Sequence, residues 1–393
     1  SWVNNNYQQP DRKILYGEIT ANPNEINLSY GGNNLLRQYF DVQGKNYFSA
    51  FAEYSLKLGE KGDKKEYPVQ LNVGYNGFAD IRNTSYRFIF SALGNNPVGS
   101  VKINIDSPQA VFDQSLLADN FHFKEGSTSE YRNNLYQFVN AGYFNINYKP
   151  TETWDIIVGG RVENSMNLTR YKKLGRNDVP FLDIAKNKYF ILPSVSVKKS
   201  LNANSNIRFA ASKTITRPIL IEYMPITYIN PDNENIFGNK DLANSENYNL
   251  DLKYEWFPTR TEMVAVNLFG KKIDKAIERS YTTSGNSNGQ TITFYNTKTA
   301  NLLGVELEAI LELKRFSEVL NHFTFGANAT FMYTDVERSD SQKNETDAEA
   351  NRKRALQGAA PYTINADLKY ELKNSKNLSQ TLSLVYNVSG KKI

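Results

Sequence analysis

The stretch of residues 303–313 limits the fold of this chain more than any other part of its sequence. Its odd positions from 305 onward are Val, Leu, Ala, Leu and Leu, while glutamates stand at 306, 308 and 312. Successive side chains of a β-strand point to opposite faces, so these residues predict a strand with one apolar and one charged face.

The same alternation returns in nearly every later segment. Residues 248–256 show it most clearly, because Tyr, Leu, Leu, Tyr and Trp alternate there with Asn, Asp, Lys and Glu. These segments have about the length that a strand needs to cross a bilayer, and short and long connections alternate between them. The sequence therefore predicts an all-β fold, a transmembrane antiparallel up-and-down β-barrel with its apolar side chains toward lipid.

Composition agrees with this prediction and excludes several other classes of protein. The mean hydropathy of the 393 residues is -0.55, and no apolar run is long enough for a transmembrane helix. The absence of cysteine excludes disulfides and thiolate chemistry. A net charge of +5, from 46 basic and 41 acidic residues, gives no sign of nucleic-acid binding. A soluble propeller or tandem sandwich remains the alternative fold.

The irregular regions are expected between about a dozen strands. We expect loops around short extended pieces in residues 1–40, an irregular region at 93–132 and a long loop at 217–242. A loop at 282–289 is expected to lead into one long strand ending at 313. The last strand, 378–388, has no closing partner, and unpaired backbone groups in lipid cost several kcal/mol each. We therefore expect this chain to be part of a larger barrel.

Four segments of the chain form an ordered set of motifs. The segments are Ser212-Lys213-Thr214-Ile215-Thr216-Arg217-Pro218 with Glu222-Tyr223-Met224-Pro225; Phe237-Gly238-Asn239-Lys240-Asp241-Leu242; Gly304-Val305-Glu306-Leu307-Glu308; and Leu356-Gln357-Gly358 with Pro361-Tyr362. In their order and spacing, they resemble the barrel half of TonB-dependent outer-membrane receptors, especially those of the Bacteroidetes type. The resemblance covers roughly residues 135–390.

The resemblance implies a barrel of about 22 strands whose lumen is filled by an N-terminal plug, which carries a short box that contacts TonB. We expect residues 1–393 to be the outer-membrane β-barrel portion of such a receptor. The plug, its box and the closing C-terminal strands are not expected within these residues.

Two groups of side chains are candidates for function. Tyr223, Tyr228 and Phe237 lie in the long loop and are candidates to stack on a ligand, with packing inside the loop as the alternative. Arg161, Glu163, Glu306 and Glu308 are expected to face the lumen, where they contact a plug, a substrate or only each other. The basic run 352–354 is expected at a rim, either against anionic lipopolysaccharide or in solvent.

No catalytic, metal or cofactor site is expected. His122 and His322 are isolated in the sequence, so an outer-membrane lipase or protease would lack its base. Asp232-Asn233-Glu234-Asn235 is rich in oxygen ligands but lacks the glycine and closing glutamate of a calcium loop.

The resulting functional hypothesis is a non-enzymatic importer in the cell outer membrane of a Gram-negative bacterium. It takes up a scarce siderophore, oligosaccharide or peptide, driven by the TonB system through a plug. Haem and cobalamin also remain open. Its other partners would be membrane lipid, lipopolysaccharide and a surface lipoprotein, but no nucleic acid. The alternative is a receptor-like barrel that serves as a structural or assembly subunit with surface lipoproteins or secretion machinery. A passive porin is a third possibility.

Overall fold

The computed structural model describes residues 1–15, 18–29, 36–59, 67–97, 100–107, 109, 113, 118–125, 132–172, 180–225, 227–229, 234–283, 290–339, 353–375 and 378–392. Within these residues, no α-helix combines the length and the apolarity that a bilayer crossing requires.

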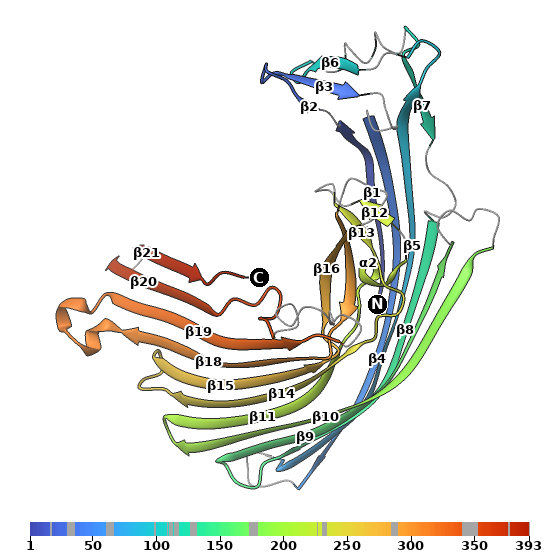
Figure 1. Ribbon diagram of the computed structural model, residues 1–393. Helices are drawn as coiled ribbons and strands as arrows, with labels where there is room; N and C mark the ends of the chain where they lie inside the picture. Colours follow the sequence, from blue (N-terminus) through green and yellow to red (C-terminus); the bar gives the residue numbers. More distant parts are fainter. Residues whose placement is uncertain are drawn as a thin grey trace.

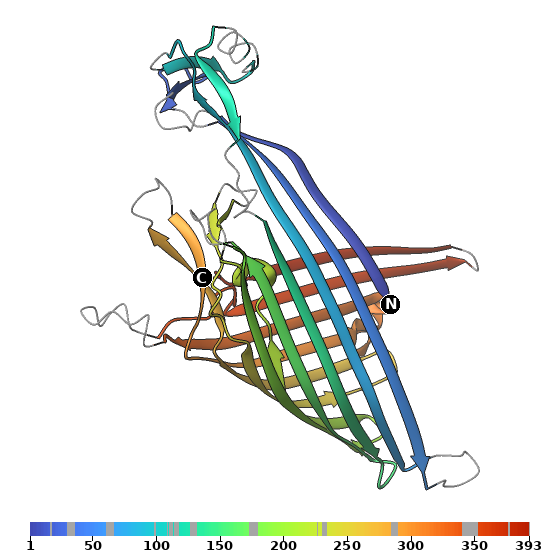
Figure 2. The same cartoon turned by 90° about the vertical axis from the view of Figure 1, so that its right-hand side faces the viewer.

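One antiparallel sheet of fourteen strands forms most of the molecule (Figures 1 and 2). Thirteen of its strands lie side by side in chain order, and β7 (Phe121–Glu125) pairs with β5 outside this path. The thirteen are β1 (Trp2–Leu15), β4 (Leu36–Leu58), β5 (Val69–Leu93), β8 (Arg132–Tyr148), β9 (Trp154–Tyr171), β10 (Leu182–Asn202), β11 (Ser205–Thr216), β14 (Ser245–Trp256), β15 (Met263–Asp274), β18 (Thr299–Glu312), β19 (Phe323–Glu337), β20 (Tyr362–Ser375) and β21 (Leu378–Ser389). The large antiparallel sheet confirms the predicted all-β, up-and-down fold.

Short and long connections lie at opposite ends of this sheet. At one end, residues 149–153, 203–204 and 257–262 join β8 to β9, β10 to β11 and β14 to β15. The connections 217–244, 275–298 and 338–361 all lie at the other end. The turn between β18 and β19 consists of two 3-10 helices, η2 (Leu313–Arg315) and η3 (Glu318–Leu320). This is the predicted alternation.

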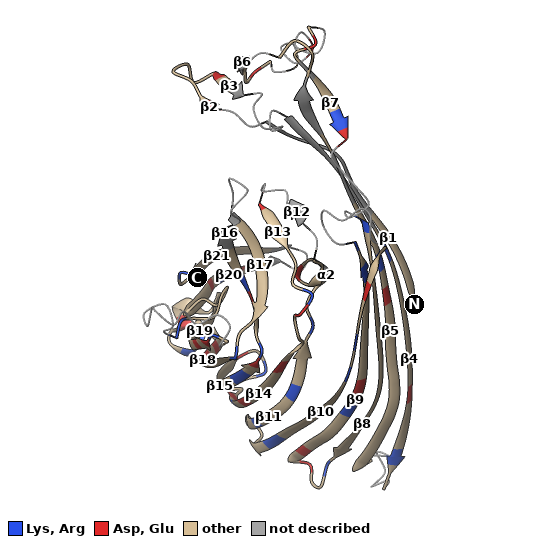
Figure 3. Cartoon of the chain, turned by 45° about the vertical axis from the view of Figure 1, so that its right-hand side comes forward, with Lys and Arg blue, Asp and Glu red and all other residues tan. Residues whose placement is uncertain are grey.

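The register of the strands separates an apolar face from a polar face. Tyr254, Val266 and Leu307 are registered neighbours on β14, β15 and β18, and all three are exposed on one face. The next residues along these strands, Glu255, Ala265 and Glu308, are registered on the opposite face. The elements of the long connections lie on the concave side of the sheet, where they cover part of the polar face (Figures 1 and 3).

Within residues 1–40, the prediction was wrong for residues 2–15 and 36–40, which belong to the long strands β1 and β4. β1 pairs with β4 from Trp2↔Phe48 to Leu15↔Leu36, with a register shift between Gln9 and Arg12. Its Asn-rich sequence hides this strand from a search for apolar alternation, but polar side chains can pair across a ladder. Asn4 Nδ2 donates to Asn46 Oδ1 on β4 at 2.8 Å. β1, β4 and β5 then run far beyond the other strands (Figure 2).

The regions predicted to be irregular contain further strands. Residues 93–132 contain β6 (Ser100–Asn104) and β7, and β6 joins β2 (Glu18–Ile19) and β3 (Glu25–Ser29) in a small sheet beyond the ends of the long strands. The predicted loop 217–242 contains α2 (Leu220–Tyr223), β12 (Thr227–Ile229) and β13 (Asn235–Phe237).

The single long strand predicted to end at 313 is in fact two strands. β17 (Gln290–Asn296) belongs to a separate sheet with β12, β13 and β16 (Ile277–Thr283), and only β18 belongs to the wall. Residues 284–289 of the predicted loop lie outside the described residues.

A buried ion pair stabilises the end of the large sheet that carries the short connections. Glu262, just before β15, is buried and accepts from Arg315 of η2 at 2.6 Å and 3.1 Å. It also accepts the backbone N–H of Glu312 at 3.2 Å. The hydrogen bond from Arg315 lowers the pKa of the Glu262 carboxyl below its ordinary value.

Replacing Leu307 by Lys should strongly impair the folding of the wall in lipid. Leu307 is 41% exposed on the apolar face, and a lysine at the middle of a lipid-facing strand costs about 2–4 kcal/mol. The measurement is the fraction of full-length protein that migrates as a folded, heat-modifiable band. Asn267→Lys is the control, because Asn267 lies on the polar face, registered with Glu306. Equal folding yields for the two variants would contradict the assignment of the faces.

Replacing Glu262 by Gln should reduce stability near neutral pH and have little effect in acid. The folded-state pKa of Glu262 is lowered from an unfolded value of about 4.3. The stabilisation is therefore fully present above that unfolded value and is lost as the pH falls through the folded pKa. Urea unfolding in micelles at several pH values measures this. A stability difference that does not change between neutral and strongly acidic pH would contradict it.

Candidate functional site

A row of polar side chains crosses five neighbouring strands on the concave face. The residues in this register are Glu255 on β14, Ala265 on β15, Glu308 on β18, Asn328 on β19 and Asn365 on β20, and all of them except Ala265 are polar. Lys253 of β14 joins the row, with its Nζ 2.9 Å from Glu308 and 4.0 Å from Glu255. Arg208 of β11 extends it, with Nε 2.7 Å from Glu255. The row places opposite charges next to each other along the wall.

Glu306 lies one step along β18 from this row and on the same face as Glu308. It is registered with Asn267, and neither glutamate shares the face of Leu303, which is 63% exposed. The structure therefore places both glutamates on the concave, polar side of the wall. A charge on the other side would meet hydrocarbon in a lipid-embedded barrel, at a cost of about 2 kcal/mol or more near the midplane.

Arg161 and Glu163 are brought together two residues apart on β9. Arg161 Nη2 lies 3.0 Å from Glu163 Oε2, and the carboxylate is almost completely buried. Arg217, the residue after β11, forms a second ion pair with the same carboxylate and reaches Ser165 Oγ at 3.4 Å. Sequence reasoning selected the first two residues but named Arg217 only as part of a motif.

A four-stranded sheet stands at the end that carries the long connections. Its order is β12-β13-β17-β16, and β13 pairs with β17 in parallel through Asn235↔Thr291, Ile236↔Ile292 and Phe237↔Thr293. Two connections that are separate in sequence, 217–244 and 275–298, are thereby joined into one unit. We call this unit the rim sheet.

The three aromatic candidates differ in their placement at the rim sheet. Tyr223 is buried, with only 4% of its surface exposed, and Lys186 of β10 lies 4.9 Å from its ring centroid. Burial raises the pKa of Tyr223 to about 12, so its hydroxyl stays protonated. Phe237 is exposed on β13. Tyr228 lies on β12, but its side chain is outside the described residues.

Side-chain amides tie the rim sheet to its neighbours. Asn239 donates to the carbonyl of Phe294 at 2.9 Å, and Asn296 donates to the carbonyl of Lys275 at 2.8 Å. Gln357 accepts from the Arg279 N–H at 3.1 Å and donates to the Arg279 carbonyl at 2.8 Å, as a neighbouring strand would. Sequence reasoning quoted Gln357 as part of a motif without finding this role.

A buried ion pair links the third long connection, residues 338–361, to the rim sheet. Glu278 of β16 accepts from Arg354 Nη1 at 3.2 Å and from the Gln357 N–H at 3.2 Å. Tyr295 of β17 also contacts Arg354, at 3.0 Å from its hydroxyl. No local sequence pattern identifies Glu278 as a functional carboxylate, because its partner Arg354 is 76 residues away.

The predicted basic cluster at 352–354 is only partly described. Lys353 pairs with Asp335 of β19 at 2.6 Å, and Arg354 is turned inward to Glu278. Arg352 lies outside the described residues, as do Asp232 and Asn233 of the oxygen-rich segment. His322 packs its ring 5.9 Å from that of Tyr370. In the described part of the chain, no group of His, Cys, Asp and Glu is arranged to hold a metal ion.

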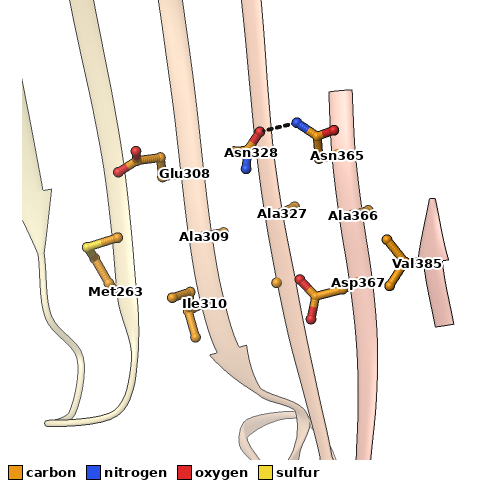
Figure 4. Close-up of a pocket in the computed structure, with 11 residues that line it drawn as sticks. Met263, Glu308, Ala309, Ile310, Ala327, Asn328, Asn365, Ala366, Asp367 and Val385 are labelled. Atoms are coloured by element: carbon orange, nitrogen blue, oxygen red, sulfur yellow. Dashed lines mark hydrogen bonds between the residues drawn. The ribbon is translucent and has the colours of Figure 1, made fainter. Parts of the chain in front are cut away.

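A groove of about 290 Å³ lies on the concave face near β21 (Figure 4). Glu308, Asn328 and Asn365 line it on one side, and Asn365 Nδ2 donates to Asn328 Oδ1 at 2.7 Å. Asp367 lies directly over Gly326, where a Cβ would collide with its carboxylate. The groove thus offers carboxylate and amide groups to whatever fills the concave side.

Comparison with known proteins gives one family and a set of structural relatives. The family model described as TonB dependent receptor-like, beta-barrel matches residues 1–392. No curated protein matches the chain.

Two solved structures share the fold at low sequence identity. The ferric yersiniabactin uptake receptor FyuA from Yersinia pestis is 12% identical, with a TM-score of 0.54, over 99% of this chain and 47% of that one. The FpvAI chain in a complex with pyocin S2 is 13% identical, with a TM-score of 0.52, over 98% of this chain and 48% of that one. The chain therefore spans about half the length of these relatives.

Replacing Glu278 by Gln should loosen the rim sheet without unfolding the wall. Arg354 would keep a partly buried charge without its carboxylate, which costs on the order of 1–3 kcal/mol. We expect faster tryptic cleavage within residues 275–298 and 353–361 and an unchanged heat-modifiable band. Glu318→Gln is the matched control, because its pair with Lys314 is exposed and spans 3.8 Å. Equal cleavage rates in both variants would contradict the assigned role of Glu278.

Proposed function

Because the chain belongs to the TonB dependent receptor-like β-barrel family, we propose that it builds part of the wall of an energy-coupled importer in the outer membrane of a Gram-negative bacterium. In this proposal, external connections capture a scarce ligand and a plug closes the lumen. Force from the TonB system then displaces the plug, and the protein catalyses no reaction. The proposed ligand is a siderophore, an oligosaccharide or a peptide.

The open edges of the sheet support the proposal that residues 1–393 are one portion of a larger barrel. Among the described residues, β1 pairs only with β4, and β21 only with β20. Strand edges facing hydrocarbon are not tolerated, because each unpaired group costs several kcal/mol. The relatives FyuA and FpvAI are about twice as long as this chain. We propose that further strands and a plug complete the barrel in the whole protein.

The polar row on the concave face is the observation that carries the proposal. Arg208, Glu255, Lys253 and Glu308 form a continuous series of ion pairs across the wall, and Glu306 lies beside it. A water-filled porin would also have a polar lumen. A charged row with adjacent carboxylates and amides, however, also supplies the hydrogen-bonding partners that the surface of a plug needs. We propose that Arg161, Glu163, Glu306 and Glu308 belong to this plug-facing wall.

The rim sheet is the proposed place of ligand capture. Its position, fixed by a hydrogen bond from Lys186 of β10 to the Lys240 carbonyl and by the ion pair of Glu278 with Arg354, would hold Phe237 at the mouth of the lumen. Exposed aromatic rings on a rigid support bind ligand faces at little entropic cost. We propose that Phe237 and Tyr228 contact ligand. Because Tyr223 is buried, its proposed contribution is to support this surface under Lys186.

The surroundings of the wall follow from the same proposal. Membrane lipid would cover the apolar face, and lipopolysaccharide would meet the end that carries the long connections. A surface lipoprotein is a candidate partner at the rim. In the alternative function, such a lipoprotein or secretion machinery would be the main partner, and nothing would be imported.

Conductance and growth together test the proposed import. In liposomes, the purified full-length protein should stay closed, and Lys253→Gln with Glu308→Gln should raise its conductance by weakening contacts to the plug. Lys272→Gln, which removes a pair with Asp274 outside the polar row, should leave conductance unchanged. In cells, growth on the limiting nutrient should require both this protein and TonB.

Each remaining outcome contradicts import in a different way. Open conductance of the unaltered protein would identify a passive porin. A closed protein whose loss leaves nutrient-limited growth unchanged, while a surface lipoprotein disappears from the cell, would favour the structural role.

A further inference from the structure

The pairing between β10 and β11 stops earlier than at any comparable place in the described wall. These strands share eight registered pairs, from Asn202↔Ser205 to Ser194↔Ser212. The other neighbours joined by short connections share eleven or more. Pro193 follows the last pair, and it has no N–H to donate to a further rung. Beyond this point, residues 182–193 pair only with β9, and residues 213–216 only with β14. We call this region, in which β10 and β11 are not paired through their backbones, the β10–β11 seam.

Side chains bridge the seam where backbone pairing has ended. Glu246 of β14 accepts from Lys188 of β10 at 2.8 Å and from Lys213 of β11 at 2.7 Å. Each lysine also lies near an aromatic ring, Lys188 at 4.7 Å from Phe190 and Lys213 at 5.3 Å from Tyr248. One carboxylate therefore holds two cations from opposite sides of the seam.

A second carboxylate has the same arrangement on the concave side. Arg217, which follows β11, crosses the seam to Glu163 on β9, and Arg161 holds the other side of that carboxylate. The side chains of Arg161 and Arg217 are largely buried, with 28% and 22% of their surface exposed. Here too, two cations share a single negative charge.

Lys186 adds a fifth cation, which forms no ion pair with any carboxylate in the described part of the chain. Its Nζ donates to the carbonyls of Lys240 and Leu242 at 2.7 Å and 3.0 Å. The nearby Asp241 pairs with Lys240 at 2.8 Å, and Asp183 on β10 pairs with Arg170 at 3.4 Å. These two carboxylates are thus matched one to one by their own cations.

Counted over the described residues that contact across it, the seam therefore carries an excess of three positive charges: Arg161, Lys186, Lys188, Lys213 and Arg217 against Glu163 and Glu246. Partly buried cations repel each other more strongly than cations in water, because the surrounding dielectric constant is lower. An added anion would relieve this repulsion and would form short charge-assisted hydrogen bonds.

We propose that the β10–β11 seam is an anion-binding site that takes a phosphate or carboxylate group. The seam begins eight registered pairs from the short turn that joins β10 to β11. This length is close to the 9–11 residues that a strand needs to cross a bilayer. That height gives access both to the polar headgroups of the outer leaflet and to solutes at the rim. A phosphate could therefore come from a lipid headgroup or from a soluble ligand.

Binding of inorganic pyrophosphate to the full-length protein in a neutral detergent tests the site. In calorimetry at constant ionic strength, Lys188→Gln with Lys213→Gln should weaken the affinity about tenfold or more, because two charged donors are lost. Glu246→Gln should strengthen it several-fold, since it removes negative charge. Lys272→Gln, a lysine with its own partner Asp274, is the matched control and should change nothing. If the double variant does not fold, Lys213→Gln alone should give a smaller loss.

A parallel measurement distinguishes the two sources of phosphate. Spin-labelled phosphatidylglycerol and phosphatidylcholine are compared in vesicles that contain the protein. Preference for the anionic lipid that is lost in the double variant identifies a headgroup site. Pyrophosphate binding without that preference identifies a soluble ligand. No binding of either probe, or equal affinities in the double variant, Glu246→Gln and the unaltered protein, would overturn the proposal.

Discussion

The structure depends on one constraint: backbone N–H and C=O groups in contact with hydrocarbon must be paired. The chain meets it by pairing neighbouring strands in order from β1 to β21, so that each inner strand is bonded to both neighbours over at least part of its length. Once the ladder is set, the two-residue period of the strands fixes which side chains meet which surroundings. Leu307 and Glu308 are neighbours in sequence, yet they lie on opposite faces of the wall.

The same constraint explains where side-chain contacts replace regular backbone pairing. Where Pro193 ends the pairing of β10 with β11, Glu246 pairs with a lysine from each of the two strands, and Glu163 of β9 pairs with Arg217 after β11. Where the wall gives way to long connections, Asn239, Asn296 and Gln357 donate to backbone carbonyls of the rim sheet. At these two places, polar side chains therefore make the contacts that backbone pairing makes elsewhere in the wall.

Sequence periodicity predicted most of the wall, because apolar and polar residues alternate along strands such as β14 and β18 and each kind lies on one face of the sheet. It failed for β1, whose polar residues pair with β4 without an apolar row. It also merged β17 with β18, because a period identifies a strand but not the sheet to which the strand belongs. The rim sheet depends on pairing between residues more than fifty positions apart, such as Ile236 and Ile292.

The candidate site was predictable only where its partners are close in sequence. Arg161 and Glu163 are two residues apart on one strand, so their common face could be read from the alternation. Arg217, the third member of that cluster, reaches Glu163 from another strand, and no local pattern shows it. Likewise, Gly238 was quoted only as part of a motif, whereas the structure shows that a Cβ there would collide with the backbone of Met224.

The central claim is that the apolar face of this wall meets lipid, and spin-label accessibility along β18 tests it most directly. The chain has no cysteine, so single cysteines can be placed at each position from 303 to 311 of the full-length protein in vesicles. The account predicts that labels at odd positions collide with oxygen dissolved in the bilayer, while labels at 306 and 308 do not. Accessibility without a two-residue period, or with labels at the glutamates meeting lipid, would contradict it.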